Sequence, residues 1–173
     1  VRAILIVAFA ILFITTLSNI FGTENTPMVV VLFCILLGIR FVNFEYCIGD
    51  SLVTLAIAFA TLLFVPAILI SVPTILIPFI HFIAIFAILC ITSQRPELGN
   101  GGLYSFAYIY LVGNPVSGEL LTQRAMMTLV GYIICAVILF VKHSHIHSET
   151  RFHHVIKRFT LKNPTHLWQL RMA

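Results

Sequence analysis

Charged residues are scarce in this chain: 9 % of its 173 residues are Asp, Glu, Lys or Arg, whereas 60 % are hydrophobic. A soluble domain usually carries about 25 % charged residues. With so few polar groups, a soluble fold of this size could not keep all of the apolar side chains away from water. The scarcity of charge therefore argues against a soluble domain and predicts an integral membrane protein, for which lipid is the solvent.

Sequence signatures of common enzyme and nucleotide-binding classes are also missing. The chain contains no GxGxxG, GxxxxGK[ST] or GxSxG motif, and no nucleophile stands beside a plausible base. Its four cysteines form no CxxC pair and lie within or at the ends of apolar stretches, which is typical of small packing residues. We therefore expect neither an enzyme nor a bound cofactor, and any transport would draw on a gradient, on diffusion or on a separate ATP-consuming subunit.

Long apolar stretches dominate the chain, and they are continuous rather than alternating, which excludes a membrane β-barrel. A helix needs about 20 residues to cross the hydrocarbon layer, and backbone groups cannot stay unpaired in lipid. We therefore predict an all-α fold: a six-helix transmembrane domain over residues 1–141, followed by a basic tail over residues 142–173. The predicted helices cover approximately residues 3–21, 28–44, 51–70, 73–91, 103–112 and 119–141.

The tail carries most of the positive charge, with six of the ten Lys and Arg residues and six of the seven histidines. Positive residues collect on the cytoplasmic side of membranes, so we expect the tail and, after six crossings, the N-terminus in the cytoplasm. Because the basic residues border an apolar segment, the expected partner is the lipid bilayer and not nucleic acid. Phe152, Val155, Ile156 and Phe159 follow helical spacing and predict a short cytoplasmic amphipathic helix.

Five histidines between residues 143 and 154 raise the question of a metal site. His143 and His147 share one helix face, but His145 does not, and no HExxH or CxxC motif supports them. A membrane-embedded metalloenzyme built on these histidines is one alternative. The interpretation that we favour is a basic, partly titratable edge at the membrane surface, so we predict no metal ligand.

Two arginines within the predicted helices are candidate substrate-binding residues, because a charged side chain at membrane depth is costly. Arg124 lies about one turn into the last helix, where it could bind an anion, reach the outer surface or pair with Glu119. Arg40 lies near the end of the second helix, and its guanidinium fork matches a carboxylate. The alternative for Arg40 is a charged helix end with local ion pairs.

Three further side chains complete the predicted site. His81 lies in the middle of an apolar helix and could relay protons, or it could simply form a hydrogen bond between helices. Tyr104 and Tyr108 belong to a short aromatic helix. They could stack on an aromatic substrate, or they could belong to an interfacial belt or to ordinary packing.

Three segments together resemble a known family. "FGTENTPMVV" leads into the second helix, "GIRFVNFEYCIGDSL" leaves it, and "LYSFAYIYLVGNPVSGELLTQR" joins the last two helices. Their order resembles the membrane half of the fusaric-acid-resistance-like (FUSC) family, which includes aromatic acid exporters of bacterial inner membranes. The resemblance covers approximately residues 1–160. It implies a six-helix bundle with a cytoplasmic region, proton-driven export of aromatic carboxylates, and added weight for Arg40 and Arg124.

These observations predict an efflux transporter, or half of one, in the bacterial inner (plasma) membrane. Its substrates would be aromatic carboxylates or similar small organic anions. Fuller members of the family carry a second membrane half, so we expect either such a partner or a homo-oligomer. The alternative is a non-transporting membrane scaffold or assembly subunit whose cytoplasmic tail binds a partner.

Overall fold

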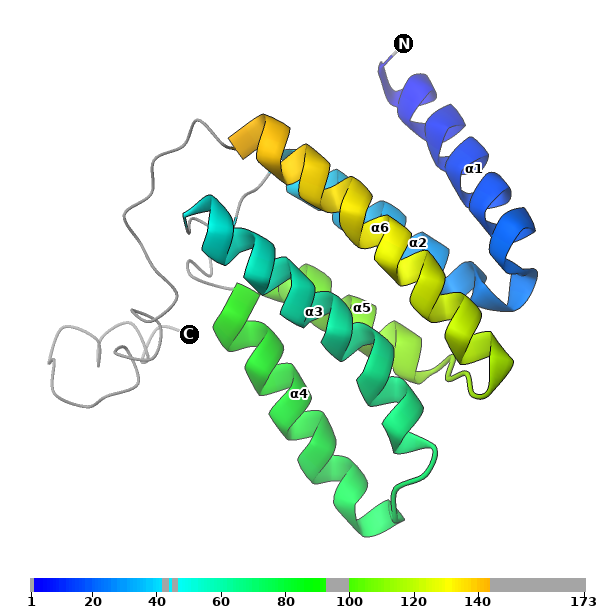
Figure 1. Ribbon diagram of the computed structural model, residues 1–173, viewed down its shortest axis with the longest axis vertical. Helices are drawn as coiled ribbons and strands as arrows, with labels where there is room; N and C mark the ends of the chain where they lie inside the picture. Colours follow the sequence, from blue (N-terminus) through cyan, green and yellow to red (C-terminus); the bar gives the residue numbers. More distant parts are fainter. Residues whose placement is uncertain (1, 42–43, 45–46, 93–99, 144–173) are drawn as a thin grey trace, which may run out of the picture.

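The computed structural model describes residues 2–41, 44, 47–92 and 100–143, and this part of the chain is all-helical with no strand (Figure 1). It contains six α-helices and two short 3-10 turns, η1 (Thr23–Asn25) and η2 (Thr74–Leu76). The all-α class and the six helices that the apolar stretches predicted are therefore confirmed. The helices are α1 (Arg2–Phe21), α2 (Thr26–Phe41), α3 (Ile48–Leu69), α4 (Ile77–Thr92), α5 (Asn100–Val112) and α6 (Glu119–His143).

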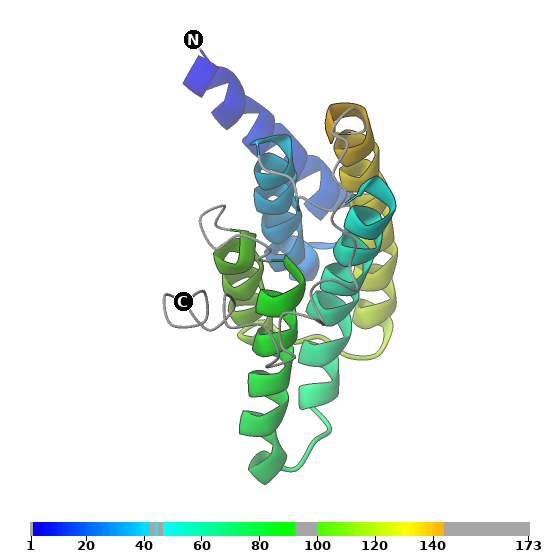
Figure 2. The same ribbon diagram turned by 90° about the vertical axis from the view of Figure 1, so that its left-hand side faces the viewer.

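Four helices form the centre of the bundle, and two lie at its edges. α2 packs against α1, α5 and α6, while α3 packs against α4, α5 and α6. In contrast, α1 contacts mainly α2, and α4 contacts α3 and α5, so these two helices occupy opposite edges in both views (Figures 1 and 2). The buried apolar core therefore lies mainly between α2, α3, α5 and α6, and Ala84 and Ile88 of α4 complete it.

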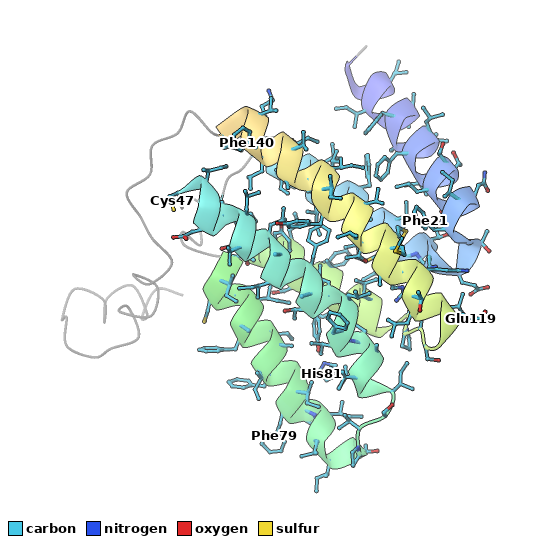
Figure 3. All side chains as sticks on the ribbon, in the orientation of Figure 1. Phe21, Cys47, Phe79, His81, Glu119 and Phe140 are labelled. Carbon is cyan, nitrogen blue, oxygen red and sulfur yellow. The ribbon has the colours of Figure 1, made fainter. Side chains whose placement is uncertain are left out.

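Successive helices run in alternating directions, so the connections gather at two ends of the bundle. Phe21 at the end of α1 lies at the same end as Glu119 at the start of α6, whereas Cys47 and Phe140 lie at the other end (Figure 3). We call the first of these the η1 end, defined by η1 and by the loop 113–118 between α5 and α6. This end holds the polar site described below.

A close approach of α2 and α6 fixes the centre of the bundle. A Cβ atom added at Gly131 of α6 would lie 2.5 Å from Cδ2 of Leu32, a fully buried side chain of α2. Small residues at such positions let two helix backbones approach each other, which is the usual way in which membrane helices pack. Gly131 therefore sets the separation between α2 and α6.

The outer faces of the helices carry large apolar side chains. On α4, Phe79, Phe82 and Phe86 are each at least half exposed, and Phe79 points away from the bundle (Figure 3). Three helical segments, Ile48–Leu69, Thr74–Thr92 and Glu119–His143, have the length and composition to cross a membrane. Because large apolar side chains on an outer face are stable in lipid and not in water, these segments indicate a transmembrane protein.

The remaining apolar helical stretches are shorter: Ile6–Phe21, Thr23–Ile39 and Gly101–Val112. α5 has 13 residues, which corresponds to a length of about 20 Å, less than the hydrocarbon layer of about 30 Å. The number of membrane crossings therefore stays a prediction. The predicted tail helix, with Phe152 and Phe159, lies outside the described residues, as do His145 and His147.

Candidate functional site

Arg124 is a buried arginine, with 2 % of its side chain exposed. It lies on the inward face of α6, because the buried residues of this helix recur at intervals of three or four positions and so share one side of it. Along this face the buried residues are Arg124, Met127, Thr128, Gly131, Cys135 and Leu139. The periodicity of α6 thus directs a charged side chain into the bundle, so Arg124 is not exposed at the surface of the bundle and forms no ion pair with Glu119.

Two neutral oxygen atoms at the η1 end hold the guanidinium of Arg124. Its Nε donates a hydrogen bond to Oδ1 of Asn25 at 3.2 Å, and its Nη1 donates to the backbone carbonyl of Asn114 at 2.9 Å. Asn25 belongs to η1, and Asn114 lies two residues after the end of α5. Arg124 therefore joins α6 to η1, which lies 99 positions away in the sequence, and to the loop that directly precedes α6.

No carboxylate balances this guanidinium among the described residues, and its Nη2 atom is buried without a hydrogen-bond partner. The Asn114 carbonyl lies just beyond the C-terminal end of α5, where the helix dipole supplies partial negative charge. This partial charge offsets only part of the positive charge of an arginine, which stays protonated in proteins. Arg124 is thus a buried cation with one nitrogen atom free to donate hydrogen bonds.

His81 and Tyr108 form a second polar contact, which joins α4 to α5. Nδ1 of His81 lies 2.8 Å from the hydroxyl of Tyr108, and the two rings meet edge to face with centroids 5.8 Å apart. Tyr108 is fully buried and His81 partly buried. The direction of this hydrogen bond depends on the histidine tautomer, so either group can be the donor.

Tyr104 lies one turn from Tyr108 on the same face of α5, and it is also buried. Its ring packs against Phe44 with centroids 5.9 Å apart, and its hydroxyl has no hydrogen-bond partner among the described residues. Thr54 of α3 is likewise buried with an unpaired hydroxyl. Both tyrosines therefore face the interior of the bundle, and neither belongs to an exposed interfacial belt.

Arg40 lies in the last turn of α2, and its side chain lies outside the described residues. It follows Asn25 by 15 positions, which places its backbone about 22 Å further along the bundle. Arg124, which binds Asn25 just before α2, and Arg40, in the last turn of α2, therefore lie near opposite ends of this helix. One small carboxylate cannot contact both arginines at once. Tyr108 and Tyr104 precede Asn114 by six and ten positions, or about 9 and 15 Å along the helix axis.

Sequence reasoning missed two residues that shape this arrangement. Asn25 belongs to the polar turn at residues 22–27. No local signal in the sequence indicates that its side chain binds Arg124, which lies 99 positions later. His143 was assigned to the basic edge, but its Nε2 lies 3.0 Å from the carbonyl of Ile39 and so joins the end of α6 to the end of α2. Within the described residues, no group of three or more His, Cys, Asp or Glu side chains could hold a metal ion.

A shallow groove of about 280 Å³ runs between α3 and α6. Ala56 and Ala60 line it on α3, and Ala125 and Leu129 line it on α6. Arg124 does not line this groove, and its Nη2 atom is shut off from solvent. The groove is therefore a feature of the apolar surface and is separate from the buried guanidinium.

Comparison with known proteins found no match: no family model, no curated protein and no solved structure matches this chain. The resemblance to the FUSC family therefore stays a prediction from the sequence.

Proposed function

We propose that this chain is a multi-pass membrane protein, or one half of a transporter, that exports small organic anions such as aromatic carboxylates from bacterial cells. The proposal includes the FUSC-type bundle of six crossings in the inner membrane, with both termini in the cytoplasm. One observation carries it: the guanidinium of Arg124 is buried inside a lipid-facing bundle, and within the part of the chain that the structure describes it has only neutral oxygens as hydrogen-bond partners and an unpaired Nη2 atom. A buried charge without a counter-ion is costly, and an anionic substrate would supply that counter-ion.

The proposed orientation puts the two arginines at different stages of the passage. The connections at residues 22–27, 70–73 and 113–118 contain no Lys or Arg, so the positive-inside rule assigns them to the outer face. Arg124 then lies near the outer face and Arg40 near the cytoplasmic face. In this proposal an anion leaving the cell meets Arg40 first and Arg124 last. An interior-negative potential favours its exit by about 2.3 kcal/mol per 100 mV for each negative charge.

Access to Arg124 requires movement in this proposal. Because Nη2 is enclosed, an anion reaches it only when η1 or the loop 113–118 moves away from α6. The hydrogen bonds from Arg124 to Asn25 and Asn114 are the contacts that such a movement would break. These segments are connections between helices, which are the usual places for a gate.

Proton coupling is assigned to the pair of His81 and Tyr108. The pair lies between α4 and α5, and neither helix contains Asp, Glu, Lys or Arg. The helix α3, which packs against both, has Asp50 as its only charged residue, in its first turn and at the end of the bundle opposite to His81. A proton bound by His81 would therefore add positive charge where no acidic side chain of these helices balances it. Substrate carboxylate and proton would then influence each other's binding, which is what coupling requires.

Growth of cells that make this chain tests the proposal directly. Cells with the wild-type chain should tolerate higher concentrations of benzoate and related aromatic acids than cells with an empty vector. Arg124→Gln should remove this protection. Lys142→Gln is the matched control, because it deletes one positive charge from an exposed position on the same helix. Equal protection by wild type and Arg124→Gln, at equal membrane levels, would refute a role for Arg124. No protection by any form would favour a scaffold.

A further inference from the structure

Asn25 is the side chain that holds the Nε end of the Arg124 guanidinium. Its side chain is fully buried, and both of its polar atoms are used. Nδ2 donates to the carbonyl of Phe21 at 3.0 Å, and Oδ1 accepts from Nε of Arg124 at 3.2 Å. The two partners fix the orientation of the amide, because a carbonyl needs a donor and a guanidinium needs an acceptor.

This arrangement positions the guanidinium without neutralising it. The oxygen atoms of Asn25 and of the Asn114 backbone are neutral acceptors, so they orient Arg124 and supply no opposite unit charge. A carboxylate in place of the Asn25 amide would form a buried ion pair with the guanidinium. Such pairs quench the field that an arriving anion would feel, because opposite charges a few ångströms apart largely cancel at longer range.

We infer that Asn25 is a positioning residue that keeps Arg124 charged and uncompensated, and that the site takes a small monoanion through a single guanidinium nitrogen. The inference rests on the proposed function. Nε already has its acceptor in Asn25, and Nη1 has one in Asn114, which leaves Nη2 as the nitrogen that has no partner among the residues described by the structure. A monocarboxylate such as benzoate matches one free nitrogen, whereas a phosphate dianion needs several donors to replace its water.

The decisive variant is Asn25→Asp, which keeps the shape of the side chain and adds one negative charge beside Arg124. For two negative charges about 6 Å apart, Coulomb's law with an effective dielectric constant of about 20 predicts roughly 100-fold weaker anion binding. The control is Gln123→Glu, the same amide-to-acid change at the residue that precedes Arg124 in the chain. The side chain of Gln123 is exposed. We expect this control to bind benzoate within about threefold of wild type, because water screens an exposed charge.

Equilibrium binding of radiolabelled benzoate to the purified full chain in detergent measures the effect. Asn25→Asp is expected to lose binding while Gln123→Glu keeps it. Folded Asn25→Asp protein that binds benzoate as wild type does would overturn the inference. Failure of the proposed function is distinct, because then neither wild type nor any variant would bind benzoate, or Arg124→Gln would bind it normally.

A second variant decides the matter if Asn25→Asp does not fold. The carboxylate cannot donate to the Phe21 carbonyl, so this variant loses one buried hydrogen bond. Asn25→Ser is neutral and is expected to keep benzoate binding within about tenfold, because it leaves the charge of Arg124 uncompensated. Complete loss of binding in a folded Asn25→Ser protein would overturn the inference, since the neutrality of residue 25 would then be insufficient.

Discussion

Replacing Gly131 with alanine tests whether the close contact of α2 and α6 holds the bundle together. A Cβ at this position would lie 2.5 Å and 2.7 Å from the two Cδ atoms of Leu32 and 3.1 Å from its Cγ. Leu32 is 1 % exposed, so it has little room to turn away. Inserting a methyl group into such a contact typically costs about 1–3 kcal/mol, and we expect that cost to appear in the free energy of unfolding.

Alanine also favours a helix over glycine by about 1 kcal/mol, and this gain has to be separated from the steric cost. Gly102→Ala in α5 is the matched control, because no atom of the described residues lies within 4 Å of a Cβ built there. It should stabilise the protein by up to about 1 kcal/mol. Comparing the free energies of unfolding of the two variants cancels the gain from helix propensity. We therefore expect Gly131→Ala to be less stable than Gly102→Ala by about 1–3 kcal/mol.

Titration with SDS in mixed micelles, followed by circular dichroism, gives the free energy of unfolding for each variant. A double variant with Leu32→Ala sharpens the test, because the new methyl group would then fill part of the space left by the leucine. We expect a favourable coupling of about 1 kcal/mol or more between the two changes. Equal stability of Gly131→Ala and Gly102→Ala, or additive effects in the double variant, would refute the packing of α2 against α6.

Two further changes test the placement of α4, one at its contact with α5 and one on its exposed face. Tyr108→Phe removes the hydroxyl that meets His81 and should cost about 1–3 kcal/mol in SDS titration, because a partly buried ring nitrogen loses its partner. A variant as stable as wild type would contradict that contact. Phe82→Lys places a charge on the exposed face of α4 and should lower the membrane insertion of the segment 74–92 in a glycosylation-mapping assay, because a lysine near the centre of a membrane helix costs about 2.5–3.5 kcal/mol. Unchanged insertion would argue that this face does not contact lipid.

The sequence predicted the helices well because their signal is local. Long apolar stretches separated by polar turns determine where helices begin and end, and each stretch carries this information by itself. The charged position of Arg124 was also visible locally, as an arginine within an apolar helix. Its direction into the bundle agrees with the spacing of the buried residues of α6.

The partners of these side chains could not be predicted, because they depend on how distant segments pack. The contact of Arg124 with Asn25 spans 99 positions, and that of His143 with Ile39 spans 104. Nothing near Asn25 in the sequence distinguishes it from another polar turn residue. The separation of Arg124 from Arg40 likewise becomes visible only when α2 is seen to run the length of the bundle between them.

Benzoate efflux from vesicles containing the purified chain tests whether the guanidinium of Arg124 binds the transported anion. Vesicles are loaded with radiolabelled benzoate, a potassium diffusion potential is set negative inside, and the loss of label is followed for wild type and for Arg124→Gln. We expect vesicles with wild-type protein to release benzoate faster than protein-free vesicles, and vesicles with Arg124→Gln to release it at the protein-free rate. Efflux at the same rate through both proteins would contradict the claim that the buried guanidinium of Arg124 binds the transported anion.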